Sequence, residues 1–131
     1  MKTPIASSLF QSPIYQKAID IMSLSHSISN YLHQDLAHLQ ADGSENAYIY
    51  FSGDIIQQSV SLAPEIAKAE EARFSDKKYK HIATVKRLTR LLNKTIKRLE
   101  QCNSNGKDYL PLLRSELKKF KQLQHTWTLT L

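Results

Sequence analysis

The sequence predicts an all-α protein, an antiparallel up-down-up-down four-helix bundle. Three observations support this fold class. The chain has 131 residues, the size of one domain. It holds only three Gly and four Pro, which favours long helices. Apolar residues recur at spacings of three and four along four successive segments, which is the period of an amphipathic helix.

The first helix is expected over about residues 13–39, after an N-terminal arm of residues 1–12. Ser12 followed by Pro13 is a typical helix start, because the hydroxyl can cap the helix and proline needs no hydrogen-bond acceptor at the first position. The apolar stripe comprises Ile14, Ala18, Ile21, Ser25, Ile28 and Leu32. A turn-rich connection at residues 40–46 ends this segment.

The second helix carries Ile49, Ile56, Ser59, Ala63, Ile66 and Ala67 on one side. Pro64 lies inside this pattern, where it removes a backbone hydrogen bond, so we expect a kink near residues 60–64. Small residues along the first two helices allow close approach, either within the bundle or to another subunit: Ser25, Ser29, Ser52, Ser59, Ser61, Ala63, Ala67 and Ala69.

The third helix is predicted over about residues 76–102, with Ser75 or Asp76 as N-cap. Its apolar seam comprises Ile82, Val85, Thr89, Leu92, Ile96 and Leu99. The fourth helix opens near Asp108 with Pro111 in its first turn, and buries Leu110, Leu113, Leu117, Phe120 and Trp127. The bundle is therefore placed at residues 13–126, followed by a tail at 127–131 that frays or lies extended.

Charge is divided unevenly along the chain. Residues 1–72 hold three Lys/Arg and eight Asp/Glu, whereas residues 73–131 hold fifteen and four, which gives −5 and +11. Such asymmetry indicates either a surface for an anionic partner or an acidic face that meets a basic one in an oligomer. Both interpretations remain open from composition.

The third and fourth helices carry basic stripes opposite their apolar seams. The candidate nucleic-acid-binding residues are Lys80, Lys86, Arg87, Arg90, Lys94, Lys97, Arg98, Arg114, Lys118 and Lys121. A solvated helix face usually mixes signs, but residues 77–98 contain no acid. This pattern favours a polyanion over an acidic protein partner or a plain solvated face.

Such cations would contact phosphates and would position RNA without reading its sequence. Few aromatic residues are expected to be available for stacking, because Tyr79 and Tyr109 are predicted to be partly buried at helix ends. Structured RNA recognised by shape is therefore favoured over single strands.

The sequence gives little indication of catalysis or metal binding. His26, His33 and the Asp35 to His38 pair lack the second Glu-x-x-His unit of a di-iron bundle. Glu65, Glu70 and Glu71 lie on different helical faces. We therefore expect no enzyme activity, no cofactor and no metal. Cys102 is expected to be a free thiol. Without a signal-like or membrane-spanning apolar run, a cytoplasmic protein is the default expectation.

The run SVSLAPEIAKAEEARFSDKKYKHI, residues 59–82, resembles a signature of a four-helix-bundle family. That family includes ribosomal-RNA intervening-sequence proteins and the accessory (Avd-like) proteins of diversity-generating retroelements. The matching pieces are Ser61-Leu62, Ile66-Ala67 and Ser75-Asp76-Lys77-Lys78-Tyr79, with Tyr15-Gln16-Lys17-Ala18 and Ile21 similar to the family's first helix. The departures are Pro64, which is shifted by one position, Ala69 in place of a frequent Gly, and Lys94 and Lys97 in place of common acids.

The resemblance implies a pentameric ring and binding of RNA or RNA–DNA together with a reverse transcriptase, with no catalytic residues to transfer. The added positive charge of this chain favours the retroelement role. The resulting expectation is a non-enzymatic RNA-binding accessory protein of a reverse transcriptase. The alternative is a homo-oligomeric scaffold or protein-interaction bundle that does not itself bind nucleic acid.

Overall fold

The computed structural model describes residues 9–131, and this part of the chain is helical without any strand. Its α-helices are α2 (Pro13–Leu36), α3 (Tyr48–Val60), α4 (Leu62–Glu71), α5 (Lys78–Leu99) and α6 (Leu110–Thr130). A short 3-10 helix, η1 (Asn105–Tyr109), leads into α6. The all-helical fold class predicted from periodicity is confirmed, and none of the described helices is both long and apolar enough to cross a bilayer.

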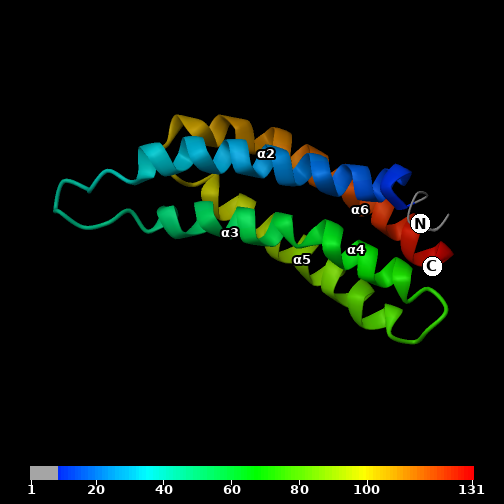
Figure 1. Cartoon of the computed structure of the whole chain (residues 1–131). Helices are drawn as coiled ribbons and strands as arrows, with labels where there is room; N and C mark the ends of the chain where they lie inside the picture. The colour runs from blue at the N-terminus through cyan, green and yellow to red at the C-terminus, as the bar shows by residue number, and fades with distance from the viewer. Residues whose placement is uncertain (1–8) are drawn as a thin grey trace.

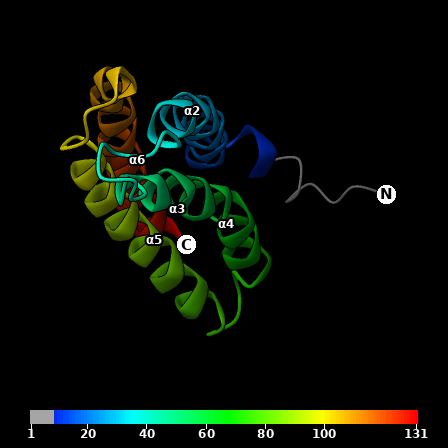
Figure 2. The ribbon, with the colours of Figure 1, turned by 90° about the vertical axis from the view of Figure 1, so that its left-hand side faces the viewer.

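The helices pack along one long axis around a shared core. Helix α2 packs on α3 and α6, and α5 packs on α3, α4 and α6. Figures 1 and 2 show α2 beside α6 on one side of the molecule and α3, α4 and α5 on the other. The connection 37–47 lies at one end of the molecule, and the connection 72–77 lies at the other, near the C-terminus (Figure 1).

The predicted apolar stripes form the core. The largest fully buried side chains are Phe120, Ile21, Leu32, Ile55, Leu62, Ile66, Leu92, Ile96, Leu99, Leu110, Leu113 and Leu117. Small residues serve the close approach of helices within the chain, because Ser25, Ser29 and Ser52 are all buried. The Ser29 hydroxyl donates to the Ser52 carbonyl and so joins α2 to α3.

The proline signals locate two helix boundaries well. Ser12 caps α2, with its Oγ 3.4 Å from the Tyr15 amide nitrogen, and Pro13 is the first helical residue. The expected kink near 60–64 is confirmed as a break at Ser61 between α3 and α4. Pro64 falls in the first turn of α4, where its missing N–H costs least.

Other boundaries differ from the sequence-based expectation. Helix α5 begins at Lys78 without a side-chain cap; the Ser75 hydroxyl instead accepts from the Lys77 amide, 3.2 Å away, within the preceding turn. Helix α6 continues through Thr130, so the expected tail 127–131 is largely helical. Leu9 is buried, so the hydrophobic core includes a residue of the expected arm; residues 1–8 lie outside the described residues.

Candidate nucleic-acid interface

The basic residues of α5 form one exposed stripe. All seven are exposed, whereas the seam on the opposite side of the helix is buried. We define the α5 stripe as Lys80, Lys86, Arg87, Arg90, Lys94, Lys97 and Arg98. The separation follows from the advance of about 100° per helical residue, which puts the two sets on opposite faces. The exposure predicted for these cations is therefore confirmed.

The basic residues of α6 are exposed beside the α5 stripe. A groove of about 410 Å³ between α5 and α6 is lined by Asn93, Pro111, Arg114, Ser115, Leu117, Lys118 and Lys121. A second hollow of about 540 Å³ on α5 is lined by Arg87, Arg90, Leu91, Asn93, Lys94 and Lys97. Asn93 lines both hollows, so the basic surfaces of the two helices are continuous.

Asn93 is not identified by sequence reasoning because it carries no charge. It is half-buried and lies between Arg90 and Lys97, one helical turn from each. Its amide can donate to a phosphate oxygen as well as accept from a sugar hydroxyl. The signal that could have identified it is its position at the edge of the stripe that faces α6.

Nine of the ten predicted cations have no acidic partner within 4.0 Å in the described residues. The exception is Arg114, whose Nη1 lies 3.0 Å and 2.9 Å from the two carboxylate oxygens of Glu100. In contrast, Lys17, Lys68, Arg73 and Lys119, outside the predicted set, are all paired with acids. Uncompensated positive charge is thus concentrated on α5 and α6.

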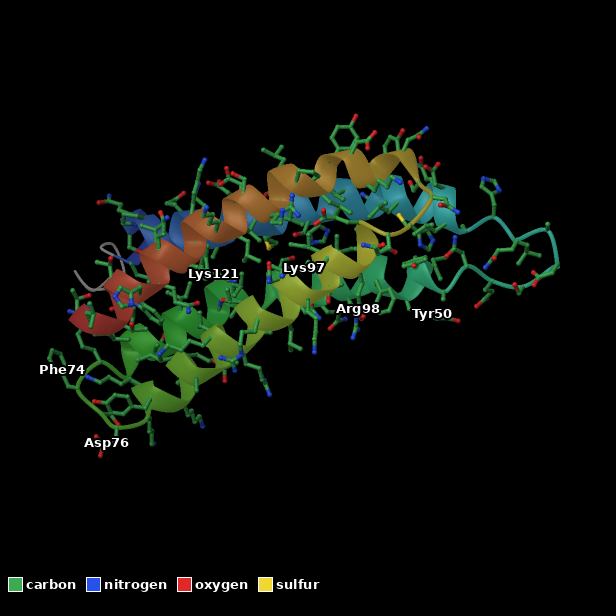
Figure 3. All side chains as sticks on the ribbon, turned by 180° about the vertical axis from the view of Figure 1, so that it is seen from behind. Tyr50, Phe74, Asp76, Lys97, Arg98 and Lys121 are labelled. Carbon is green, nitrogen blue, oxygen red and sulfur yellow. The ribbon has the colours of Figure 1, made fainter. Side chains whose placement is uncertain are left out.

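The α5 stripe extends from the side of the helix that faces α6 to the side that faces α3. Lys97 lies on the side of α5 toward α6, with Lys121 along the same side, whereas Arg98 lies toward Tyr50 (Figure 3). The Arg98 guanidinium carbon is 5.3 Å from the ring centre of Phe51 on α3, a cation–π contact. Arg98 is therefore partly oriented by α3, while the rest of the stripe faces solvent.

The exposed aromatic residues are more numerous than the sequence suggests. The expectation that Tyr79 and Tyr109 are partly buried is wrong, because they are 61% and 52% exposed. Phe74 is 93% exposed and Tyr50 63% exposed, and neither belongs to the surface predicted from the sequence. These residues lie at helix ends and in a turn, where burial depends on the tertiary packing and not on helical period.

Two of the three acidic residues considered for catalysis, Glu65 and Glu70, join helices, whereas Glu71 is exposed. Glu65 Oε2 on α4 lies 2.8 Å from His81 Nδ1 on α5. Burial by itself raises the pKa of Glu65, but hydrogen bonds from His81 and Lys68 outweigh it and hold the pKa below its ordinary value. Glu70 accepts from Trp127 on α6. Within residues 9–131 no three His, Cys, Asp or Glu side chains are grouped to hold a metal ion.

Comparison with known proteins adds no assignment. No family model matches the chain, and no significant match is found among curated proteins or solved structures. The resemblance to the retroelement and intervening-sequence family therefore stays a prediction. The fold and the site define an all-helical protein with a continuous basic surface on α5 and α6, of whose predicted cations only Arg114 has an acidic partner in the described residues.

Proposed function

We propose that this chain is a non-enzymatic nucleic-acid-binding protein that holds structured RNA on the surface of α5 and α6. The observation that carries the proposal is the set of nine exposed cations on two adjacent helices, which lack acidic partners among residues 9–131. Like charges three and four residues apart repel each other by a few tenths of a kcal/mol per pair. Phosphates bound along the helices would remove that repulsion.

The chemistry of this surface suits the backbone of a nucleic acid. Arg87 and Arg90 can each fork onto two phosphate oxygens, whereas Lys94 acts as a point charge. Each contact releases counterions from the nucleic acid, so the affinity falls steeply as salt rises. Such contacts set position and orientation but carry no sequence information.

We further infer that the helices form an antiparallel up-down-up-down bundle and that copies of it assemble into a ring. The resemblance described above favours a pentamer and, as partner, a reverse transcriptase of a diversity-generating retroelement acting on RNA or RNA–DNA in the cytoplasm. The exposed apolar side chains of α3, among them Tyr50 and Val60, supply surface for subunit contact. In this arrangement the nucleic acid and the neighbouring subunits use different helices.

The second candidate function is a homo-oligomeric scaffold in which the basic surface meets an acidic neighbour. The exposed Asp20 on α2 and Asp54 on α3 supply negative charge on the helices that carry no basic stripe. In that case the α5 stripe would be covered by a second copy of the chain. The two candidates therefore make opposite predictions about what happens when the stripe is neutralised.

The test is salt-dependent binding of a folded RNA hairpin, measured by fluorescence anisotropy between about 50 and 200 mM salt. The variant is the triple Arg87→Gln, Arg90→Gln, Lys94→Gln, and the matched control is Lys68→Gln, Lys107→Gln, Lys119→Gln, with the same change in net charge. We expect the first triple to reduce the slope of log affinity against log salt by about three, and the control to leave it nearly unchanged.

Two results would reject the proposal. One is a wild-type affinity that does not change with salt. The other is an equal loss of affinity in both triples, which would mean that only net charge matters. If the wild type binds no RNA and the α5 triple dissociates the oligomer in sedimentation, the scaffold is the correct function.

A further inference from the structure

Phe74 is an aromatic residue held in solvent by an ordered turn. The turn 72–77 joins α4 to α5, and the Phe74 side chain is 93% exposed. The turn is fixed by hydrogen bonds: the Ser75 amide donates to the Ala72 carbonyl at 2.8 Å, and the Arg73 amide donates to the Glu70 carbonyl at 3.2 Å. Figure 3 shows Phe74 and Asp76 at the same end of the molecule. An ordered backbone thus presents the ring to solvent at little further entropic cost.

Tyr79 adds a second exposed ring at the start of the basic stripe. It lies on the same helical face as Lys86, Arg90 and Lys97, because those residues follow it by 7, 11 and 18 positions, close to whole numbers of turns. The Lys78 ammonium lies 5.3 Å from the centre of the Tyr79 ring. The Tyr79 ring and these three cations therefore lie on one face of α5, and Phe74 precedes Tyr79 by five residues.

We propose that Phe74 and Tyr79 stack on unpaired bases that adjoin the stem whose phosphates lie along the α5 stripe. The inference rests on the proposed function and specifies its ligand: a folded RNA with an unpaired segment next to the stem. Bases of any sequence offer a face for stacking, so the two rings add affinity without sequence preference. The cations hold the neighbouring phosphates, and the rings bind the bases that the stem leaves unpaired.

The other exposed aromatic residues are less suited to this role. The Tyr50 hydroxyl donates to a carboxylate oxygen of Glu45, 2.6 Å away, and that carboxylate repels phosphate. Tyr109 packs edge-on against Tyr31, with ring centres 5.7 Å apart, beside α2. Tyr79, in the first turn of α5, instead lies within an acid-free stretch, since residues 77–98 contain no Asp or Glu. Between Phe74 and this stretch the only acid is Asp76.

Asp76 places an acid beside this site and provides an internal check. Its exposed carboxylate lies two residues from Phe74 and weakens the attraction for phosphate. Neutralising it by Asp76→Asn should increase the affinity for a tailed RNA by about twofold at low salt, with a smaller gain at high salt. The affinity for the blunt hairpin should increase less, because that RNA has no tail phosphates near Asp76 and its stem phosphates lie along α5.

The experiment compares three RNA hairpins with the same stem: a blunt one, one with an unpaired tail of about six nucleotides, and one whose tail lacks bases. Wild-type protein should bind the tailed hairpin about tenfold more tightly than the blunt one. The tail without bases should give only the small gain due to its extra phosphates. Phe74→Ala should remove part of the tenfold preference and leave the blunt hairpin's affinity unchanged, the double variant Phe74→Ala, Tyr79→Ala should remove most of it, and Phe74→Trp should keep it.

The control is Leu39→Ala, which removes another large exposed apolar side chain, 66% exposed, in the connection 37–47 at the opposite end of the molecule. Leu39→Ala should change the affinity for neither the blunt nor the tailed hairpin. Circular dichroism should show unaltered folding for both variants, since neither side chain is buried.

The outcomes separate this inference from the function on which it rests. Equal binding of blunt and tailed hairpins, with normal salt dependence, would overturn the stacking inference and leave the proposed function in place. A tail preference that persists in full in the double variant Phe74→Ala, Tyr79→Ala would also overturn it. If the wild type binds none of the three hairpins, the proposed function itself fails.

Discussion

The indole Nε1–H of Trp127 donates a hydrogen bond to Oε1 of Glu70 across 2.9 Å, and this contact joins the last turns of α6 to the end of α4. Trp127 is only 7% exposed. The other Glu70 oxygen accepts from Arg73 at 3.0 Å, so the carboxylate is bonded on both sides. This contact explains why α6 continues to Thr130 instead of fraying after residue 126.

Replacing Trp127 by phenylalanine should lower the free energy of unfolding by about 1–3 kcal/mol, because phenylalanine keeps an aromatic ring in the core but loses volume and the N–H that the Glu70 carboxylate needs. Urea unfolding followed by circular dichroism measures the change. A double-mutant cycle with Glu70→Ala is the control: if Trp127→Phe costs the same in that background, the hydrogen bond contributes nothing.

Two glycines should respond to alanine with opposite signs. A Cβ on Gly106 would lie 2.6 Å from Cδ1 of Tyr31 and 3.0 Å from Cδ2 of Leu32, because η1 packs closely on α2. Gly106→Ala should therefore destabilise the protein by about 1–3 kcal/mol. A Cβ added to Gly53, inside α3, would meet no neighbouring atom of residues 9–131 within 4 Å, so Gly53→Ala should stabilise by about 0.5–1 kcal/mol.

Thermal unfolding of both glycine variants checks this pair of predictions. A stabilised Gly106→Ala protein would mean that Tyr31 and Leu32 move aside without cost. A destabilised Gly53→Ala protein would mean that the exposed side of α3 needs that glycine for a contact outside the monomer.

The ion pair between Lys17 and Glu116 should make stability depend on acidic pH. Lys17 Nζ lies 2.6 Å from Glu116 Oε2 and joins α2 to α6. The hydrogen bond from Lys17, with a smaller one from Lys119, lowers the pKa of Glu116 below its ordinary value of 4.5 despite partial burial. Because the folded-state pKa is the lower one, the stabilisation is present above pH 4.5 and is lost as pH falls through the folded-state pKa.

Glu116→Gln should accordingly be less stable than the wild type at neutral pH, by up to about 1 kcal/mol. The difference should shrink as the pH falls below 4.5. Urea unfolding at a series of pH values from about 7 to 3 measures it. A constant difference over this range would show that the carboxylate's charge is not what matters; Lys119→Gln, which removes the weaker partner at 3.4 Å, is the control.

Reversing one charge of the α5 stripe should stabilise the fold while weakening RNA binding. A glutamate at position 90 would lie three residues from Arg87 and four from both Lys86 and Lys94, so Arg90→Glu replaces three repulsions by three attractions. We expect a gain of about 1 kcal/mol in the free energy of unfolding at low salt. Thermal unfolding at about 20 and 500 mM salt measures it, and the gain should shrink at the higher salt.

Arg90→Gln is the matched control, since it removes the repulsion without adding attraction and should give about half the gain. An Arg90→Glu protein that is less stable than the wild type would indicate that Arg90 makes a stabilising contact within the fold. The positive charge of the stripe would then be explained by stability and would not support binding of a partner.

The features that depend on local chain geometry could be predicted from the sequence. The apolar seam from Ile82 to Leu99 and the opposed α5 stripe follow from the helical period of about 3.6 residues, which needs no knowledge of neighbouring helices. The start of α2 at Pro13 and the break near Pro64 follow from the missing N–H of proline. These signals were sufficient for the fold class and for the exposure of the candidate site residues.

The features that depend on distant contacts could not be predicted. Only the packing of α5 against α6 pairs Arg114 with Glu100, 14 residues away, and makes Asn93 the junction of two basic hollows. Trp127 meets Glu70 across 57 residues, and this contact turns an expected tail into helix. The sequence by itself determined which faces are apolar and which are basic. The tertiary structure decided which charges are neutralised and which rings, such as Phe74, remain in solvent, because those depend on which helices become neighbours.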